Sequence, residues 1–253
     1  MVSIKDGDEV LFIDPTGKTF LKKICMMSFH THHGVISLND LIGKPYGSTV
    51  KTSTDKSFII VKPDLRDLLA KKLRRGPQII HRKDIGLIIT HLGLTRDSVV
   101  LEAGTGSAYL TSHLGSICKK VVTCELREDH FKKASENIAA LGLEKNVDYR
   151  NIDVESAPGK DYDAIILDMP KQEDIIPKVC GKLKIGGRIA VYSPCVDQSM
   201  MVCRALEENG FIDVIFMECM IREWGVNKGT RPNTMMLGHT GFLVFARYMG
   251  SEM

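Results

Sequence analysis

The stretch VVLEAGTGSAY, residues 99–109, runs from an apolar segment into a loop that contains two glycines. Gly104 and Gly106 are spaced as in the loop that binds dinucleotides, but Tyr109 stands where that loop has its third glycine. The third glycine lets the following helix take a pyrophosphate on its N-terminus. Tyr109 therefore disfavours a pyrophosphate ligand, and leaves either a ligand without phosphates or an ordinary turn between a strand and a helix.

Outward from this loop, residues 82–253 alternate between strand and helix patterns. The predicted strands are 98–103, 119–126, 147–152, 162–169, 187–193, 212–221 and 241–248. Helices are predicted over 82–92, 109–116, 127–141 and 197–209, with another that ends near Leu183. This order is typical of an α/β fold with a mostly parallel, seven-stranded sheet covered on both faces. The last two strands follow each other without a helix, so we expect an antiparallel edge.

The first part of the chain has a different pattern. Residues 1–63 contain short apolar runs, such as VLFID and SFIIV, separated by turn signals such as DPTG, which predicts a small all-β module. Residues 64–81 are expected to form a basic linker, and 82–253 the second domain. The excess of positive charge lies in KKLRRGPQIIHRKD, residues 71–84. Charge alone leaves two interpretations open, a contact for a nucleic-acid backbone or a solvated helix face.

Composition narrows the class of protein. Of the 253 residues 43% are hydrophobic, and no apolar run approaches the ~20 residues that span a bilayer, so we expect no membrane segment. The start of the chain, MVSIKDGDEV, lacks the apolar core of a signal peptide. Seven scattered cysteines without a C-x-x-C pair suit a reducing cytoplasm and argue against a zinc ribbon, while individual disulfides stay open.

Four groups of polar residues fall at the predicted carboxyl ends of strands, where ligands bind in open α/β sheets. They are Glu102 with Gly104, Thr105, Gly106 and Ser107; Glu125; Asp153; and Asp168. An acid in the position of Glu125 can accept hydrogen bonds from both hydroxyls of a ribose, and Asp153 can meet an adenine edge. An adenosine without phosphates fits this set, so the sequence favours S-adenosylmethionine as the ligand over an ordinary turn.

Asp168, in the segment LDMP, is the candidate catalytic residue. If the methyl acceptor is a ring nitrogen beside an exocyclic amine, its lone pair is free at neutral pH and catalysis depends on positioning and on stabilising the cation that forms. A carboxylate that accepts a hydrogen bond from the exocyclic amine does both. Methyltransferases that act on that amine typically have a second proline and an aromatic residue here, and LDMPK has neither. The alternative is that Asp168 caps a helix that begins near Lys171.

The histidines near the start of the chain and the single tryptophan are less specific indicators of function. His30, His32 and His33 could suggest a metal, but no acidic or cysteine partner is near them in the sequence, so we expect a polar loop or a contact with nucleic acid, and no metal site. Trp224 is expected to pack in the core or in an interface.

The chain resembles the class I tRNA (adenine-N1)-methyltransferases that modify the T-loop adenosine at position 58 of tRNA. The resemblance covers nearly the whole chain and rests on motifs in both parts. They are HTHHGVISLNDLIGKPYGS, RRGPQIIHRKD, VLEAGTGS, CELREDHFKKA, ILDMP and REWGVNKGTRPNTMMLGHTGFLVF. It implies a Rossmann-like fold, S-adenosylmethionine as the methyl donor, a homotetramer and a β module that helps to bind tRNA; methylation of the adjacent position 57 stays open.

The resemblance also implies roles for residues outside the glycine loop. Gln78 and His130 match positions that help to hold the donor, and His81 and His239 match positions near the substrate. The basic candidates for contact with tRNA are Lys71, Lys72, Arg74 and Arg75. The chain departs from the family at His81-Arg82, where Tyr-Pro is usual, at Lys171-Gln172, where the family often has tryptophan, and at Ala108, where glycine is usual.

Two functions from different classes follow. The first is a tRNA (adenine-N1)-methyltransferase, and the second is a catalytically silent tRNA-binding subunit with the same fold. The intact Gly-Thr-Gly-Ser loop, Glu125 and Asp168 favour the enzyme. A methyltransferase that acts on a small molecule or a protein is a weaker third option, because the basic run and the β module argue against it.

Overall fold

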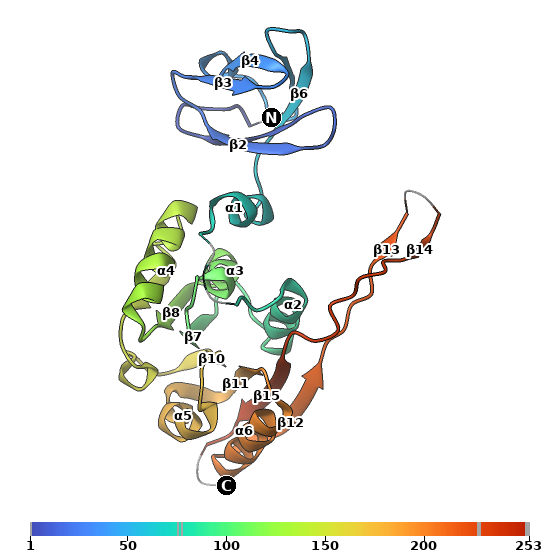
Figure 1. Cartoon of the computed structure of the whole chain (residues 1–253). Helices are drawn as coiled ribbons and strands as arrows, with labels where there is room; N and C mark the ends of the chain where they lie inside the picture. Colours follow the sequence, from blue (N-terminus) through green and yellow to red (C-terminus); the bar gives the residue numbers. More distant parts are fainter. Residues whose placement is uncertain (1, 75, 77, 227–228, 251–253) are drawn as a thin grey trace. The chain divides into compact units, whose positions relative to one another are not determined.

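The computed structural model describes residues 2–74, 76, 78–226 and 229–250, and the chain divides into two compact units (Figure 1). Unit 1 is Met1–Leu73 and unit 2 is Arg74–Met253.

Unit 1 is built on an antiparallel sheet with the strand order β2-β1-β6-β5. Its strands are β1 (Glu9–Ile13), β2 (Thr19–Lys23), β5 (Thr49–Lys51) and β6 (Ser57–Val61). A separate hairpin joins β3 (Ser28–Thr31) to β4 (Gly34–Ser37), and a 3-10 helix covers Asn39–Leu41. Phe12, Phe58 and Ile60 are fully buried in the core. The all-β pattern predicted for 1–63 is therefore present.

The strands β2 and β3 are separate, because the Ile24 amide and carbonyl bond to Asp8 and Gly7 and the chain then turns. One detail of unit 1 differs from the expectation. Residues 65–72 form a helix, α1 (Leu65–Lys72), where the sequence analysis places a linker. Asp64 caps this helix by accepting from the Asp67 amide, and the Asp67 carboxylate accepts from the Asp64 amide in return.

Unit 2 contains a seven-stranded sheet with the order β12-β15-β11-β10-β7-β8-β9. The strands are β7 (Val99–Ala103), β8 (Lys120–Cys124), β9 (Val147–Arg150), β10 (Tyr162–Leu167), β11 (Leu183–Ser193), β12 (Phe211–Glu218) and β15 (Phe242–Tyr248). Within the sheet, β11, β10, β7, β8 and β9 are parallel to one another. Strand β15 is antiparallel to both of its neighbours, β11 and β12. This confirms the mostly parallel, seven-stranded sheet and its antiparallel edge.

Five helices cover the two faces of this sheet. They are α2 (Arg82–His91), α3 (Tyr109–Ile117), α4 (Glu128–Leu141), α5 (Gln172–Val179) and α6 (Val196–Glu208). One core combines side chains of α2, α3 and α4, such as Ile88 and Leu114, and the other combines side chains of α5 and α6, such as Ile176 and Leu206. Because both faces are covered, the ligand site is left to the ends of the strands.

An arm leaves the sheet between β12 and β15 and comprises residues 219–226 and 229–241 (Figure 1). It contains two short paired strands, β13 (Trp224–Gly225) and β14 (Arg231–Pro232), which the sequence analysis does not predict. Phe242, the first residue of β15, pairs with both Ser193 at the end of β11 and Glu218 at the end of β12. The arm therefore starts and finishes at the end of the sheet where the parallel strands have their carboxyl ends.

Among the helices of the described residues, none is long and apolar enough to cross a membrane. All seven cysteines are free thiols, and Cys118, Cys124 and Cys180 are buried.

Candidate functional site: strand ends and the base of the arm

The glycine loop after β7 passes directly over the end of β10. Gly104 has a φ of 86°, and a Cβ at this position would overlap with the carbonyl oxygen of Asp168. The Gly104 amide donates to the carbonyl of Cys124 at 3.1 Å. Residue 104 must therefore be glycine for β7, β8 and β10 to end side by side.

Glu125 lies at the centre of these strand ends and is largely buried. One of its carboxylate oxygens accepts from the Gly106 amide at 3.0 Å, and the other accepts from the Arg127 amide at 2.9 Å. A carboxylate has about four lone-pair sites, so these two bonds fix its orientation and leave capacity for two further donors. A carboxylate with this free capacity can accept hydrogen bonds from two hydroxyl groups.

A pocket of about 180 Å³, here called the strand-end pocket, opens beside Glu125. Gly104, Asp153 and Met169 also line it. Asp153 has a second role, because its side chain accepts from the Glu155 amide at 3.0 Å and caps the 3-10 helix Val154–Ser156. The structure therefore brings three of the four predicted groups to one pocket.

Asp168 follows β10 and is half-buried next to Gly104. Its amide donates to the carbonyl of Ala103 at 2.9 Å, but no hydrogen-bond or ion-pair partner of its carboxylate lies within residues 2–74, 76, 78–226 and 229–250. Burial, and then the nearby charge of Glu125, raise the pKa of Asp168 to about 7. The N-cap of α5 is Lys171, so Asp168 does not cap this helix.

The glycine loop is supported by three buried polar residues, Glu102, Thr105 and Ser107. The Glu102 carboxylate accepts from the Thr111 hydroxyl at 2.7 Å, and burial raises its pKa to about 7. The Thr105 hydroxyl bonds to that of Thr123 at 2.6 Å. Ser107 has a buried hydroxyl with no hydrogen-bond partner among the described residues. Of these three, only Ser107 has an unused polar atom.

Asn137 on α4, which the sequence analysis does not single out, ties the loop to the start of unit 2. Its amide nitrogen donates to the carbonyl of Ser107 at 2.9 Å, and its oxygen accepts from the Arg74 amide at 2.9 Å. His130 on the same helix lies 3.9 Å from a Glu125 oxygen, which places it beside the expected ribose. Gln78 is exposed and does not line the strand-end pocket.

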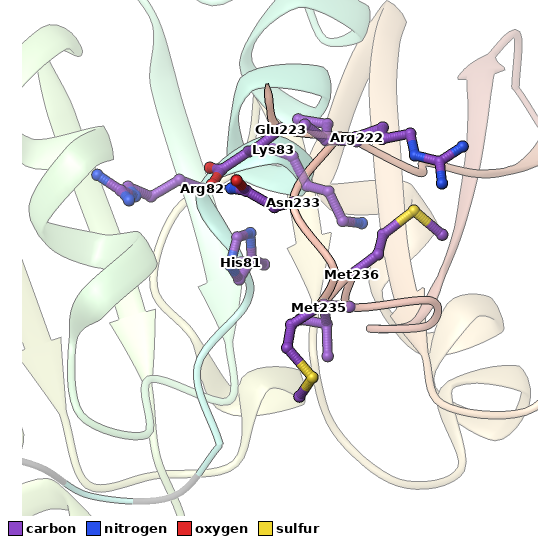
Figure 2. A pocket seen from close by; sticks show the side chains of 10 residues that line it. His81, Arg82, Lys83, Arg222, Glu223, Asn233, Met235 and Met236 are labelled. Carbon is purple, nitrogen blue, oxygen red and sulfur yellow. Dashed lines mark hydrogen bonds between the residues drawn. The ribbon is translucent and has the colours of Figure 1, made fainter. Parts of the chain in front are cut away.

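A second pocket of about 500 Å³, here called the arm pocket, lies between the start of α2 and the base of the arm (Figure 2). His81 and Lys83 line it from the helix, and Asn233, Met235 and Met236 line it from the arm. His81 is also the N-cap residue of α2, and its side chain makes no capping bond. Of the predicted substrate residues, His81 is therefore the one that lines this pocket.

A buried polar network ties α2 to the end of the arm. The Lys83 ammonium donates to an Asp84 oxygen at 2.7 Å and to the Thr240 hydroxyl at 2.6 Å, and that hydroxyl donates to the other Asp84 oxygen at 2.8 Å. The Tyr192 hydroxyl, at the end of β11, donates to the carbonyl of Thr240 at 2.6 Å. Burial raises the pKa of Tyr192 to about 12, and the charges of Asp84 and Asp168 add to this. Tyr192 therefore joins the end of β11 to the end of the arm.

This network was missed by sequence reasoning. Lys83 and Asp84 belong to the motif RRGPQIIHRKD, which indicates the family but not a network, and Thr240 is far from both residues in the sequence. The signal that could have found it is the pair of opposite charges, Lys83 and Asp84, directly before the largely apolar run IGLII of the same helix.

The remaining predicted substrate residues have partners within the chain. The His239 ring bonds to a Glu218 oxygen at 2.6 Å, which raises its pKa. Arg74 forms an ion pair with Glu136 at 2.6 Å. Within unit 1, Lys71 donates to the carbonyl of Thr19 at 2.8 Å, and Lys72 pairs with Glu9 at 2.6 Å. Arg75 lies outside the described residues.

Comparisons with known proteins give the family of the chain. Residues 57–230 match the model of the family described as tRNA methyltransferase complex GCD14 subunit, and residues 3–50 match a TrmI-like N-terminal family. The chain is 32% identical to the tRNA (adenine(57)-N(1)/adenine(58)-N(1))-methyltransferase TrmI of Methanocaldococcus jannaschii, over 94% of each chain.

Two solved structures are similar along nearly their whole length. One is the tRNA (m1A58) methyltransferase TrmI of Aquifex aeolicus, with a TM-score of 0.78, 29% identity and coverage of 97% of this chain and 98% of that one. The other is described as an S-adenosylmethionine-dependent O-methyltransferase of Thermotoga maritima, with a TM-score of 0.83, 30% identity and coverage of 98% and 95%. The glycine loop, Glu125 and these matches together show that the chain belongs to the TrmI-like family of S-adenosylmethionine-dependent tRNA (adenine-N1)-methyltransferases.

Proposed function

We propose that this protein transfers a methyl group from S-adenosylmethionine to N1 of adenosine 58 in the T-loop of tRNA, with adenosine 57 as a second target. The relatives from M. jannaschii and A. aeolicus support the reaction and the position, and the M. jannaschii name includes position 57. The observation that carries the proposal is the placement of Glu125 and Asp168 at the ends of β8 and β10, the two strands that flank β7 and its glycine loop.

The strand-end pocket fits the adenosine part of the donor. Glu125 would hold the two ribose hydroxyls with its unused lone pairs, and Asp153 and Met169 would line the adenine. The unpartnered Ser107 hydroxyl is a polar atom that a bound group could satisfy. When bound, the donor supplies a methyl group on a positively charged sulfur.

The residues of this chain then have two tasks. Asp168 accepts a hydrogen bond from the exocyclic amine of the target adenine, which points N1 at the methyl group and offsets the positive charge that develops on the ring. No general base is needed for the attack, because N1 carries no proton at neutral pH. The arm pocket would receive the target nucleotide and its neighbours.

The decisive experiment is mass spectrometry of unmodified tRNA after incubation with the protein and S-adenosylmethionine. The expected product is 1-methyladenosine in the T-loop fragment. Donor binding by calorimetry separates the alternative of a silent tRNA-binding subunit: binding of tRNA without binding of the donor, and without product, would establish that alternative. A tRNA with adenosine 58 replaced by guanosine tests whether position 57 is modified independently.

The homotetramer is also part of this proposal. Large apolar side chains are exposed along the arm; they include Met220, Trp224, Val226, Met235 and Leu237. Exposed apolar groups gathered on one segment are typical of a surface that binds another chain, and the occupant proposed here is a second copy of the protein. Light scattering should give the mass of a tetramer, and Met220→Glu, a change outside the arm pocket, should lower it. A cytoplasmic location suits the tRNA substrate and the seven free thiols.

A further inference from the structure

The turn of the β3–β4 hairpin in unit 1 places two histidines beside a buried acid. His32 and His33 lie in this turn, and their ring centroids are 3.8 Å apart. His33 Nε2 lies 3.8 Å from Asp14 Oδ2. One ligand atom from each of the three residues lies within 4.8 Å of the other two. The expectation of no metal site rested on the lack of an acidic partner, and that premise is wrong, because folding brings Asp14 to the turn.

The Asp14 carboxylate uses only one of its two oxygens within the protein. Oδ1 accepts from the Thr16 amide at 2.8 Å, the Thr16 hydroxyl at 2.6 Å and the Lys18 amide at 2.9 Å. Oδ2 and His33 Nε2 are both buried, and neither has a hydrogen-bond partner among the described residues. Asp14 is only 4% exposed, so an unsatisfied oxygen here has a real cost in free energy. A ligand between Oδ2 and Nε2 would satisfy both atoms.

The histidine turn is held in place by a neighbouring loop. The Thr54 hydroxyl donates to the carbonyl of His33 at 2.6 Å, and the Ser53 hydroxyl accepts from the Val35 amide at 3.0 Å. Gly34, with a φ of 102°, leaves room for these hydroxyls, because a Cβ there would lie 2.8 Å from Ser53 Oγ. The two rings are therefore presented to Asp14 before any ligand arrives.

We propose that Asp14, His32 and His33 form a binding site for a divalent cation of the Zn²⁺ class in unit 1. Two imidazole nitrogens and one carboxylate oxygen are a donor set that such ions prefer, and they disfavour Mg²⁺. Metal–ligand bonds of about 2.0–2.1 Å put the ligand atoms of a tetrahedral ion roughly 3.3 Å apart, so a small contraction of the turn completes the site. Water supplies the fourth position. The ion joins the β1–β2 turn to the β3–β4 turn and stabilises unit 1.

The test is calorimetric titration of Zn²⁺ into the full-length, tag-free protein after its exposed thiols have been blocked. We expect saturable binding of one ion, a visible absorption spectrum with Co²⁺ that reports tetrahedral nitrogen and oxygen ligands, and no binding of Mg²⁺. Thermal unfolding of unit 1 should move up by roughly 5 °C with saturating Zn²⁺. No binding at all would overturn the proposal and leave Asp14 and His33 as a simple ion pair.

The variants are chosen to keep the fold. Asp14→Asn retains the oxygen that accepts from Thr16 and Lys18 but removes the charged ligand. This change and His33→Gln should each weaken Zn²⁺ binding by about tenfold or more. His30→Gln is the control, because His30 is exposed on the adjacent strand and lies outside the cluster. Equal loss in all three variants, or unchanged affinity in the first two, would show that Zn²⁺ binds elsewhere.

Discussion

Burial raises the pKa of Asp168 and that of Glu102 to about 7, but the two carboxylates differ in their partners. Glu102 is enclosed and hydrogen-bonded to Thr111, whereas Asp168 is half-buried and has no side-chain partner among the described residues. A carboxylate with unused acceptors beside a ligand pocket is suited to bind a donor group of a substrate. The enclosed one is suited to support the fold.

Asp168→Asn separates binding from chemistry. The variant should fold and keep most of its affinity for tRNA, because phosphate contacts dominate that affinity. The single-turnover rate should fall by about two orders of magnitude or more, since one preorganised electrostatic partner is lost. A fall of less than a few-fold, with both ligands still bound, would remove Asp168 from the catalytic role.

The raised pKa of Asp168 also predicts a pH dependence. Because only the ionised carboxylate can offset a cation, the rate should rise with pH through about 7 and then level off. At one pH unit below this pKa the rate should be about a tenth of the plateau. Single-turnover rates between pH 5.5 and 8.5 measure this, and the Asp168→Asn variant should show a flat profile over the same range.

Glu102→Gln should stabilise the protein at high pH. The pKa of Glu102 is about 7 in the folded state and 4.5 for an unperturbed group, so the folded state binds more protons between these values. The stability of the natural protein therefore falls as pH rises from 4.5 to 7, and that of the glutamine variant does not. Above pH 7 the variant should gain up to about 3 kcal/mol in free energy of unfolding.

Urea denaturation followed by circular dichroism at pH 5 and pH 8 tests this difference. Glutamine can still accept the hydrogen bond from Thr111, so the change removes the charge and little else. Glu144→Gln is a matched control, because Glu144 is exposed. A gain that is the same at both pH values would contradict the assignment of the raised pKa to Glu102.

Among the elements, the arm depends on its connection to α2. The Thr240 hydroxyl both accepts from Lys83 and donates to Asp84, and these two side chains are 4% and 0% exposed. Thr240→Val keeps the shape but leaves a buried charged pair without two hydrogen bonds. We expect a loss of about 2–4 kcal/mol in free energy of unfolding, with unchanged affinity for the donor.

Thermal unfolding and donor calorimetry check this prediction. Thr234→Val is the control, because Thr234 lies on the same arm but is exposed. A similar loss of stability in both variants would mean that any threonine substitution in the arm destabilises the protein. The network would then make no particular contribution to stability.

The elements show where sequence reasoning succeeds and where it stops. The glycine loop, Glu125 and Asp168 are found because each follows a recognisable strand, and parallel strands end at one edge. The arm is missed because its short strands β13 and β14 have no hydrophobic period. Asp14 and His33 lie in separate turns of unit 1, and only the pairing of its strands brings them together.

At the scale of the whole molecule, the basic run of residues 71–84 matters through its net positive charge, because several of its side chains already have partners within the chain. Lys71, Lys72 and Arg74 each have a partner within the chain, but their net charge still attracts phosphates. Neutralising them together with Arg75 should weaken tRNA binding and lower the slope of log affinity against log salt by up to about 3. Filter binding at several salt concentrations measures this slope.

The control for this experiment neutralises Lys119, Lys145 and Lys160, which are exposed on unit 2. This change should leave the slope nearly the same, and the affinity for the donor should be unaffected in both variants. If the two sets of substitutions alter the slope equally, the basic run has no privileged contact with tRNA.

The register at the base of the arm has a consequence for how such enzymes diversify. Because Phe242 pairs with both Ser193 and Glu218, the two ends of the arm are fixed side by side whatever lies between them. Insertions or deletions in the arm therefore add only a small loop-closure cost and leave the sheet and the donor site intact. An exchange of residues 219–238 for a segment of another length would therefore change the surface beside the strand ends and leave the strands that carry Glu125 and Asp168 in place.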